Sequence, residues 1–409
     1  MAGGLAIFYE DAFDDGGAPV GLQHLVRAFA GEIPVYLYGK ASDAAPDLGR
    51  GVRREYPSLL SLPGRLRSWL RSDRPDVLLV VGFFLPHNPI AVAVARRQGI
   101  PTAIHPMSQI SDIMFTDRVF THGCDVADLE KQSVNAERVR DRIAAKASPL
   151  AKQAFCGTAG RYMMARSWGS AVLSAEEARQ LRRRYPHHTD PIVELPWGTD
   201  SESVPAEPPR HFYRDVLGLT DDRANLVVWS RLDYRFKGLD RVLDGARSAL
   251  DAGGGEVPFR LFLCGPDYRG GDGAARAHIE RLGLHEVVRV LGPGEYPPGG
   301  KTPLRDATAT VLLSRWDGSP RTLREAAHFG RPMVVTEETN FADLVRRHEC
   351  GTVVDGDDPD GVGKALLEMA DPSSQERYSR GARALAGASE WEQIGLRFMK
   401  DVERLRAAE

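Results

Sequence analysis

The feature that most constrains the fold is the repeated alternation of short apolar runs with helical stretches. The run Val77–Val81 is apolar at every position, which is typical of a strand covered on both faces. Strands separated by helices along the whole chain predict parallel α/β architecture. The expected strands are Leu5–Tyr9, Val35–Tyr38, Val77–Val81, Thr102–Ile104, Ala171–Ser174, Leu226–Ser230, Phe259–Cys264, Val287–Leu291, Thr308–Ser314, Met333–Thr336 and Thr352–Val354.

The chain length of 409 residues suggests at least two domains. A polar, proline-rich stretch, Gly198 to Pro209, separates two halves that each repeat the strand–helix pattern. We therefore place a first domain at residues 1–198 and a second at 199–387. A terminal helix from about Trp391, within residues 388–409, is expected to return to the first domain. The first helix is expected at Gly21–Ala30, and an exposed loop at 43–52.

A candidate ligand site follows one of the predicted second-half strands. Asp317 precedes a helix start, and Glu325 lies more than one turn inside that helix. Ser319 suits the N-cap, Pro320 suits the first helical position, and Gly330 ends the helix. Free backbone N–H groups at such a start bind anions, and a diphosphate fits them. An ordinary surface helix is the alternative, but ligands bind where strands of this kind end. The residues predicted to bind here are Asp317, Gly318, Ser319, Thr322, Leu323 and Glu325.

Two cations follow another predicted strand of the second half. Arg231 and Lys237 lie in the loop before a helix that begins after Gly238. A fork-shaped guanidinium and a compact ammonium suit a pyrophosphate, whereas elsewhere such charges are by default solvated. Gly265 and Gly292 end two further strands, where glycines let a flat nucleobase approach the backbone.

In order and spacing these residues resemble the "group 1" family of retaining glycosyltransferases with the GT-B fold. That family carries an Arg…Lys-Gly motif early in its second domain and an acid-x7-acid motif later. The counterparts here are Arg231, Lys237-Gly238, Asp317 and Glu325. The resemblance covers nearly the whole chain and implies two Rossmann-like domains whose parallel sheets face a central cleft. Asp317 replaces the family's usual glutamate, which leaves the donor sugar open.

The first domain carries looser motifs of the same family. Gly16-Gly17 fits its glycine loop after the first strand, and His105 fits a histidine at the end of an N-domain strand. The segment 195–200 resembles its hinge, and Trp391 opens a segment like its terminal crossover helix. The resemblance implies that Gly16 and Gly17 approach the donor phosphate or the acceptor and that His105 contacts the donor sugar. The alternatives are an ordinary turn and a hydrogen-bonded histidine at a strand end.

The resemblance implies transfer of a hexose-type sugar from a nucleotide-diphosphate sugar, with retention at the anomeric carbon. His105, Arg231, Lys237 and Asp317 are the predicted catalytic residues. The segment 355–358, the nearest approach to an Asp-x-Asp metal motif, is predicted to be a turn. Fixed cations and the helix start are expected to stabilise the leaving group instead, so we expect neither cofactor nor metal. The alternatives are a GT-B epimerase and an inactive subunit that binds a nucleotide sugar; the presence of all four motif residues counts against the second.

Composition and charge limit the classes of partner that this chain is expected to bind. A formal net charge of -3 argues against a nucleic-acid binder. The four cysteines lie far apart, and no signal core or apolar run of ~20 residues is present, so a cytoplasmic protein is expected. The acceptor, a small molecule, glycan or lipid-linked sugar, is expected at first-domain loops such as 107–126, which includes His122. The basic amphipathic stretch Gly64–Arg74 allows peripheral membrane contact, although packing beside a strand is favoured.

Overall fold

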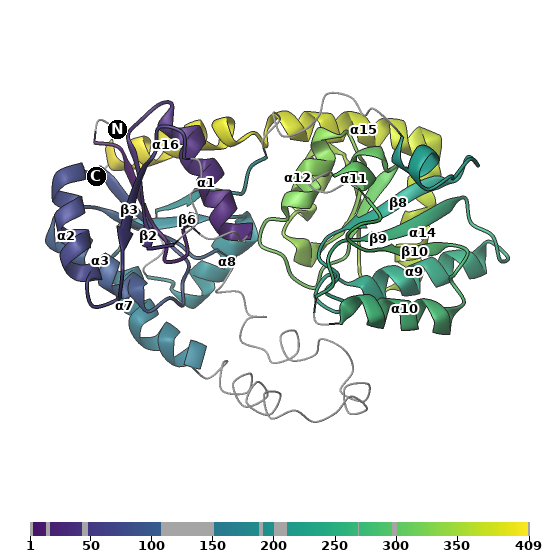
Figure 1. Cartoon of the computed structure of the whole chain (residues 1–409), viewed down its shortest axis with the longest axis horizontal. Coiled ribbons are helices and arrows are strands. Elements are labelled where there is room, and N and C mark those ends of the chain that lie inside the picture. Colours follow the sequence, from purple (N-terminus) through teal and green to yellow (C-terminus); the bar gives the residue numbers. More distant parts are fainter. Residues whose placement is uncertain are drawn as a thin grey trace. The chain divides into compact units, whose positions relative to one another are not determined.

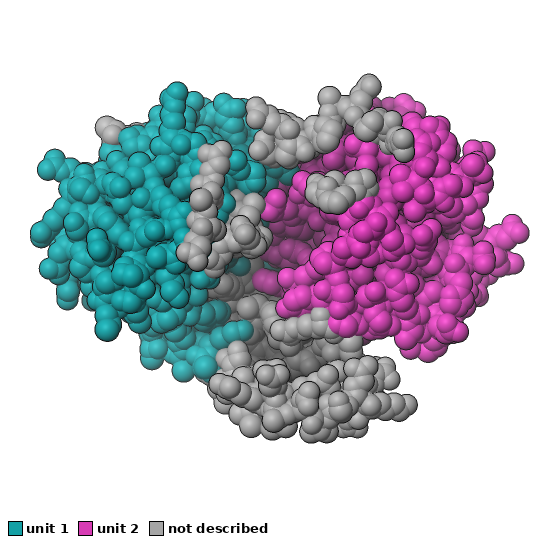
Figure 2. All heavy atoms as spheres, viewed as in Figure 1, with its two compact units in different colours: residues 1–116, 146–200, 390–409 teal, residues 117–145, 201–389 magenta. Residues whose placement is uncertain are grey.

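The computed structural model consists of two compact units, which Figure 2 distinguishes by colour. It describes residues 3–13, 17–42, 48–107, 151–187, 191–199, 211–268, 270–296 and 301–407. The first unit comprises Met1–Thr116, Lys146–Asp200 and Glu390–Glu409, and the second is built on Ser201–Ser389. Gly16, His122, nearly all of the loop expected at 107–126 and most of the expected boundary at 198–209 lie outside the described residues.

The first unit is built on a parallel sheet of seven strands in the order β3-β2-β1-β4-β5-β6-β7. This order reverses between β1 and β4, as in doubly wound nucleotide-binding folds. The strands are β1 (Leu5–Phe8), β2 (Val35–Lys40), β3 (Val52–Tyr56), β4 (Val77–Val81), β5 (Thr102–His105), β6 (Gly169–Val172) and β7 (Ile192–Glu194).

Two layers of helices cover the sheet of the first unit. α1 (Gly17–Ala30) and the terminal helix α16 (Trp391–Ala407) share a hydrophobic cluster with one face. The other face carries α2 (Leu62–Asp73), α3 (His87–Arg97), α7 (Arg161–Arg166) and α8 (Ala175–Arg184). In α2 the leucines at 62, 66 and 70 recur at helical spacing and are buried. Packing beside the sheet is therefore the role of this helix's apolar stripe.

The second unit is built on a parallel sheet of six strands in the order β10-β9-β8-β11-β12-β13. α9, α10 and α14 pack on one face, and α11, α12, α13 and α15 on the other (Figure 1). The strands are β8 (Ala224–Trp229), β9 (Phe259–Cys264), β10 (Val288–Leu291), β11 (Ala309–Leu312), β12 (Met333–Thr336) and β13 (Gly351–Val354). The helices are α9 (Leu239–Ala252), α10 (Gly271–Leu282), α11 (Thr302–Asp306), α12 (Arg321–His328), α13 (Ala342–His348), α14 (Pro359–Ala370) and α15 (Pro372–Gly387).

The predicted fold class, two Rossmann-like domains with parallel sheets, is confirmed, but several element bounds are wrong. β6 ends at Val172 because Ser174 leaves the strand to cap α8, where its hydroxyl accepts the N–H of Glu177 at 3.1 Å. α1 begins at Gly17 rather than Gly21. The loop expected to reach Val52 ends before it, because Val52 begins the unpredicted strand β3.

Candidate functional site

The second-unit residues singled out by sequence lie where the order of the second sheet reverses. β8 and β11 pair directly, although their neighbours on either side are β9 and β12. Arg231 and Lys237 follow β8, and Asp317 follows β11. Open parallel sheets bind ligands at the carboxyl ends of strands beside such a reversal. This edge of the second sheet is therefore the candidate site.

The two motifs meet in an ion pair. Lys237 Nζ lies 2.6 Å from Asp317 Oδ2, and the two side chains are only 14% and 16% exposed. The loop after β12 fixes the backbone of Asp317, whose N–H donates to the Glu338 carbonyl at 2.9 Å and whose carbonyl accepts from the Asn340 amide. The two motifs are therefore in direct contact with each other.

Arg231 lies beside this pair in sequence but is held differently. Its guanidinium sits 4.5 Å from the centroid of the Tyr268 ring and 5.4 Å from that of Phe236. The nearest carboxylate, that of Asp233, is 3.8 Å away, and the arginine side chain is 45% exposed. Stacking on aromatic faces positions the guanidinium, and its ion pair with Asp233 is long. An anionic ligand can therefore reach it.

Gly238 allows the two loops to approach. It is the N-cap of α9 with φ +66°, a left-handed conformation that favours glycine. A Cβ atom at this position would lie 2.0 Å from the carbonyl oxygen of Leu313 at the end of β11. Any other residue would push the β8–α9 loop away from the β11 end.

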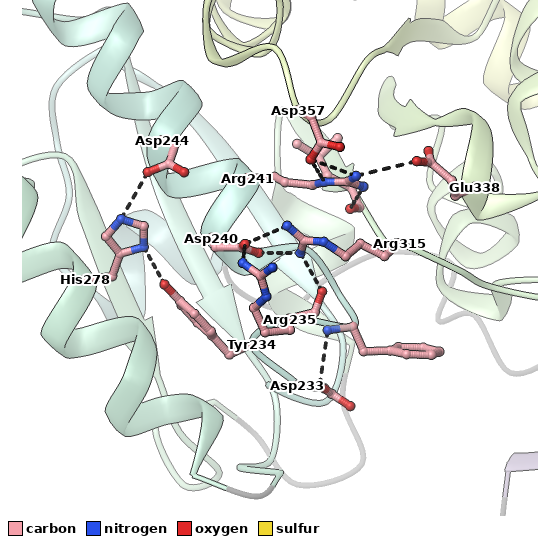
Figure 3. Close-up of polar contacts among 12 residues, drawn as sticks. Asp233, Tyr234, Arg235, Asp240, Arg241, Asp244, His278, Arg315, Glu338 and Asp357 are labelled. Carbon is pink, nitrogen blue, oxygen red and sulfur yellow. Dashed lines mark hydrogen bonds and ion pairs between the residues drawn. The ribbon is translucent and has the colours of Figure 1, made fainter. Parts of the chain in front are cut away.

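An ion-pair network lies beneath the β8–α9 loop (Figure 3). Both oxygens of the buried Asp240 accept from Arg315, each at 2.7 Å, and Oδ2 also accepts from Arg235 at 2.6 Å. Arg315 follows β11 and donates as well to the Arg235 carbonyl at 2.7 Å. Burial opposes the charge on Arg315, but its hydrogen bonds to Asp240 outweigh that cost and raise its pKa. Asp240 thus links Arg235 of the β8–α9 loop to Arg315 of the loop after β11.

A second polar chain in Figure 3 holds the middle of the same loop. His278 Nε2 lies 3.0 Å from Asp244 Oδ1, and His278 Nδ1 lies 2.6 Å from the Tyr234 hydroxyl. Because Nε2 faces a carboxylate it carries the proton of the neutral ring, so the tyrosine O–H donates to Nδ1. Burial, helped by the charge of Asp240, raises the pKa of Tyr234 to about 12. The loop is therefore tied to α9 and α10 as well.

The start of α12 differs from the prediction. Pro320, not Ser319, is the N-cap, because its φ and ψ of -67° and 110° are extended and the helix begins at Arg321. The buried Ser319 hydroxyl has no partner among the described residues. The Thr322 hydroxyl donates to the Trp229 carbonyl at 3.0 Å, and the Leu323 N–H donates to the Pro320 carbonyl at 3.2 Å. Thr322 therefore joins α12 to the end of β8, and Ser319, beside the buried Gly318, keeps hydrogen-bonding capacity.

Glu325 is held by a residue that sequence reasoning missed. Its Oε1 lies 2.9 Å from Lys301 Nζ and 3.8 Å from an Arg321 nitrogen, and its side chain is 10% exposed. Lys301 follows a Pro-Pro-Gly-Gly stretch with no recognisable motif, so no pattern points to it. A ligand that bound Glu325 would have to share it with this lysine.

Contacts within the chain involve Gly265 and Gly292, the two glycines predicted to let a nucleobase approach the backbone. Gly265 adopts φ +151°, and a Cβ there would lie 1.8 Å from the Ser230 carbonyl oxygen. The ends of β8 and β9 thus demand glycine whether or not a nucleobase binds. The N–H of Gly292 donates to Glu295 Oε2 at 2.7 Å.

Comparison with known proteins identifies this unit. The sequence model of the family described as "Glycosyl transferases group 1" matches residues 209–385. The matched region lies within the second unit, which therefore resembles a group 1 glycosyl transferase domain. A curated relative, D-inositol 3-phosphate glycosyltransferase of Acidothermus cellulolyticus, is 29% identical over 225 residues. That match spans 53% of this chain and about half, 48%, of the relative.

Solved structures match the whole chain in fold. Sucrose-phosphate synthase from Thermosynechococcus elongatus superimposes with a TM-score of 0.66 at 17% identity, covering 99% of both chains. Anabaena HepE in complex with UDP gives a TM-score of 0.71 at 14% identity, covering 98% of this chain and 100% of the other. At such identities the likeness shows the fold alone, and this likeness includes the first unit, which the family model does not cover.

Within the first unit, His105 is the predicted site residue whose burial and hydrogen bonding the structure describes. It ends β5 and is completely buried, with Nδ1 2.9 Å from the Ala171 carbonyl oxygen. A carbonyl only accepts, so Nδ1 carries the proton and Nε2 is an acceptor. Nε2 has no partner among the described residues, and burial lowers the His105 pKa to about 4. Contact with a sugar hydroxyl requires the side chains that cover His105 to move.

Gly17, the other described site residue predicted in the first unit, is the first residue of α1.

The described residues contain no group of three or more His, Cys, Asp or Glu side chains arranged to hold a metal ion. In the turn after β13, Asp357 Oδ1 lies 3.0 Å from an Arg241 nitrogen of the second unit. Within the described part of the chain no helix is long and apolar enough to cross a membrane.

Proposed function

We propose that the chain transfers a hexose-type sugar from a nucleoside-diphosphate sugar to a hydroxyl-bearing acceptor, with retention at the anomeric carbon and without a metal. The observation that carries the proposal is the contact between Lys237 and Asp317 at the sheet reversal. It joins a cation suited to the diphosphate with a carboxylate suited to a sugar hydroxyl. The group 1 match over residues 209–385 supports this assignment.

In the proposed reaction, binding of the donor rearranges the ion pair. Lys237 turns from Asp317 to the diphosphate, Arg231 adds its guanidinium, and Asp317 becomes available to a hydroxyl of the transferred sugar. The anomeric C–O bond then breaks, and its electron pair goes to the diphosphate oxygen. The acceptor oxygen bonds to the anomeric carbon on the same face, and its proton passes to the leaving phosphate. Fixed cations stabilise the growing charge because they need no reorganisation during the reaction.

A similar solved structure supports a nucleoside diphosphate as part of the donor, whereas the identities of the sugar and of the acceptor are left to experiment. One structural neighbour was solved with UDP, which makes uridine nucleotides the first donors to test. The curated relative is named for an inositol phosphate acceptor, so polyol phosphates head the list of acceptors. Asp317 has one methylene fewer than glutamate, which changes which hydroxyl of the sugar it reaches.

The test begins with a thermal-shift screen of nucleoside-diphosphate sugars, because a ligand at 100 times its Kd stabilises by ~2.7 kcal/mol. The best donor is then incubated with candidate acceptors, and the anomeric configuration of the product is read by NMR. We expect a glycoside with the donor's configuration. Release of free sugar from donor alone would instead identify an epimerase. Binding without turnover across the acceptor panel would identify a subunit that only holds the donor.

A further inference from the structure

Three neighbouring helices on one face of the first sheet carry an arginine-rich outer side. α2 contacts α3, α3 contacts α7, and all three pack inward through one hydrophobic cluster (Figure 1). Exposed arginines project from each helix: Arg65, Arg67, Arg96, Arg97, Arg161 and Arg166. We call these six residues the arginine face. None of them forms an ion pair with a described residue.

No exposed carboxylate balances these charges on the same helices. The one acidic residue of α2, α3 and α7 is Asp73. Asp73 is buried and accepts from Arg54 at 2.8 Å and from the Tyr38 hydroxyl at 3.0 Å. Since the whole chain carries a formal charge of -3, the arginine face has the opposite sign to the molecule. Charge segregated in this way attracts an anionic partner locally.

Large apolar side chains accompany the arginines. Leu60, next to the N-cap Ser61 of α2, is 94% exposed, and its neighbour Leu59 is 42% exposed. Tyr162, between the arginines of α7, is 37% exposed. A single exposed leucine is ordinary, but exposed leucines next to unpaired guanidinium groups form a surface with both an apolar and a cationic component. An anionic lipid bilayer offers both complements.

We propose that the arginine face docks the first unit on an anionic lipid bilayer, with the Leu59-Leu60 tip entering the boundary between headgroups and acyl chains. Guanidinium groups suit lipid phosphates because their N–H donors form a planar fork. The exposed leucine tip favours lipid over a nucleic acid, whose backbone gives it nothing apolar to enter. The apolar stripe of α2 is buried, so docking uses the outer side of a folded helix.

The test is co-sedimentation of the full chain with vesicles of phosphatidylcholine, with or without phosphatidylglycerol. We expect binding to the anionic vesicles only. Arg65→Glu/Arg67→Glu is expected to reduce it at least about tenfold, since each cation near such a surface contributes ~1 kcal/mol. Leu60→Ser is expected to weaken it as well. The matched controls lie in the second unit: Arg347→Glu/Lys364→Glu at two exposed cations for charge, and Val216→Ser, which replaces a residue 49% exposed.

Equal sedimentation with neutral vesicles, or none with anionic ones, overturns the proposal. So does unchanged binding in the arginine variant, or an equal loss in the second-unit charge control. Preference for a DNA duplex over anionic vesicles would assign the face to nucleic acid instead. Thermal melts of each variant show that it is folded. None of the residues changed in these variants belongs to the predicted donor site, so the vesicle result is independent of whether sugar transfer is found.

Discussion

At the scale of single residues, the proposed transfer depends most on the Lys237–Asp317 pair. Removing the lysine leaves Asp317 facing the diphosphate with uncompensated charge, and removing Arg231 takes away the second cation. We expect Lys237→Ala and Arg231→Ala each to lower turnover by about 10² to 10³, as for other losses of fixed transition-state stabilisation. Steady-state kinetics with the identified donor measures this. Lys364→Ala, at an exposed lysine of α14, is the control, and wild-type turnover in both site variants would contradict the assignment.

Asp317 and Glu325 are expected to have separable roles. Glu325 lies within α12 and is paired with Lys301, a position suited to the donor ribose. Asp317 lies in the preceding loop against Lys237 and is expected to bind the transferred sugar. Glu325→Gln should therefore weaken the nucleoside diphosphate product as well as the donor, by about tenfold for one charged hydrogen bond. Asp317→Asn should lower turnover and leave product affinity nearly unchanged.

Calorimetric titration of the diphosphate product separates these roles. Equal losses of product affinity in both variants would refute the division. A loss confined to Asp317→Asn would reverse it. Asp317→Glu, which restores the residue usual in the resembled family, is the informative companion, because a changed sugar preference with unchanged product affinity would place Asp317 at the sugar.

His105 makes the stability of the first unit depend on pH. Burial lowers its pKa to about 4, whereas an unfolded histidine titrates near ~6.5. The unfolded chain thus binds a proton between these values that the folded chain does not. Stability is therefore lost as pH falls through this window, by up to about 3 kcal/mol at ~1.4 kcal/mol per unit.

Urea unfolding of wild type and His105→Gln measures this contribution. The variant cannot titrate, so the wild-type advantage should be larger at pH 7 than at pH 4.5. A difference that stays constant across this range would show that folding does not lower the pKa of His105.

At the scale of elements, the sequence predicted best the bounds of strands that are largely apolar. The bounds of β4, β9 and β12 agree with their predicted ranges, and the one charged residue in these three strands is Arg260 of β9. β3 was missed because Val-Arg-Arg-Glu-Tyr is mostly charged, as suits an edge strand half in water. The Ser319 cap was wrong because the backbone stays extended through Pro320, a choice that tertiary contacts of the loop decide.

The site was predicted only as far as its motifs reach. The local sequence spacing predicted Arg231, Lys237 and Asp317 as site residues. Lys237 and Asp317 are in contact because β8 and β11 are neighbours in the sheet. Asp240 was missed because its partner Arg315 lies 75 residues away, and no local pattern announces such a pair. Lys301 was missed for the same reason.

The network beneath the β8–α9 loop is expected to position its cations. Tyr234→Phe removes the donor to His278 Nδ1 and loosens the loop that carries Arg231 and Lys237. We expect stability to fall by ~1 kcal/mol, with about tenfold weaker binding of the nucleoside diphosphate. The control is Tyr378→Phe in α15, which removes a hydroxyl that donates to Glu368 of α14 at 2.7 Å. It should lose similar stability and keep its affinity, so equal affinities in the two variants would show that the tyrosine serves the fold alone.

At the scale of the whole molecule, two units of the same architecture carry different surfaces. In the proposed function the donor binds at one sheet edge of the second unit, while α2, α3 and α7 of the first unit carry the arginine face. The same fold serves both because helix packing uses only the inward stripes. The outward sides and the strand-end loops are then free to specialise.

The positive charge that the second unit supplies leads to the last prediction, on metal dependence. A leaving diphosphate gains negative charge, which a divalent cation or fixed protein groups can stabilise. Arg231 and Lys237 of the β8–α9 loop and the first turn of α12 provide such groups from two segments at one sheet edge. We therefore expect turnover to be unchanged in excess EDTA. Lys237→Ala tests the reason: if this lysine does the work of a metal, added Mg²⁺ should restore part of the variant's activity and leave the wild type unaffected. Loss of wild-type turnover in EDTA with recovery on Mg²⁺ or Mn²⁺ would show that the reaction uses a metal.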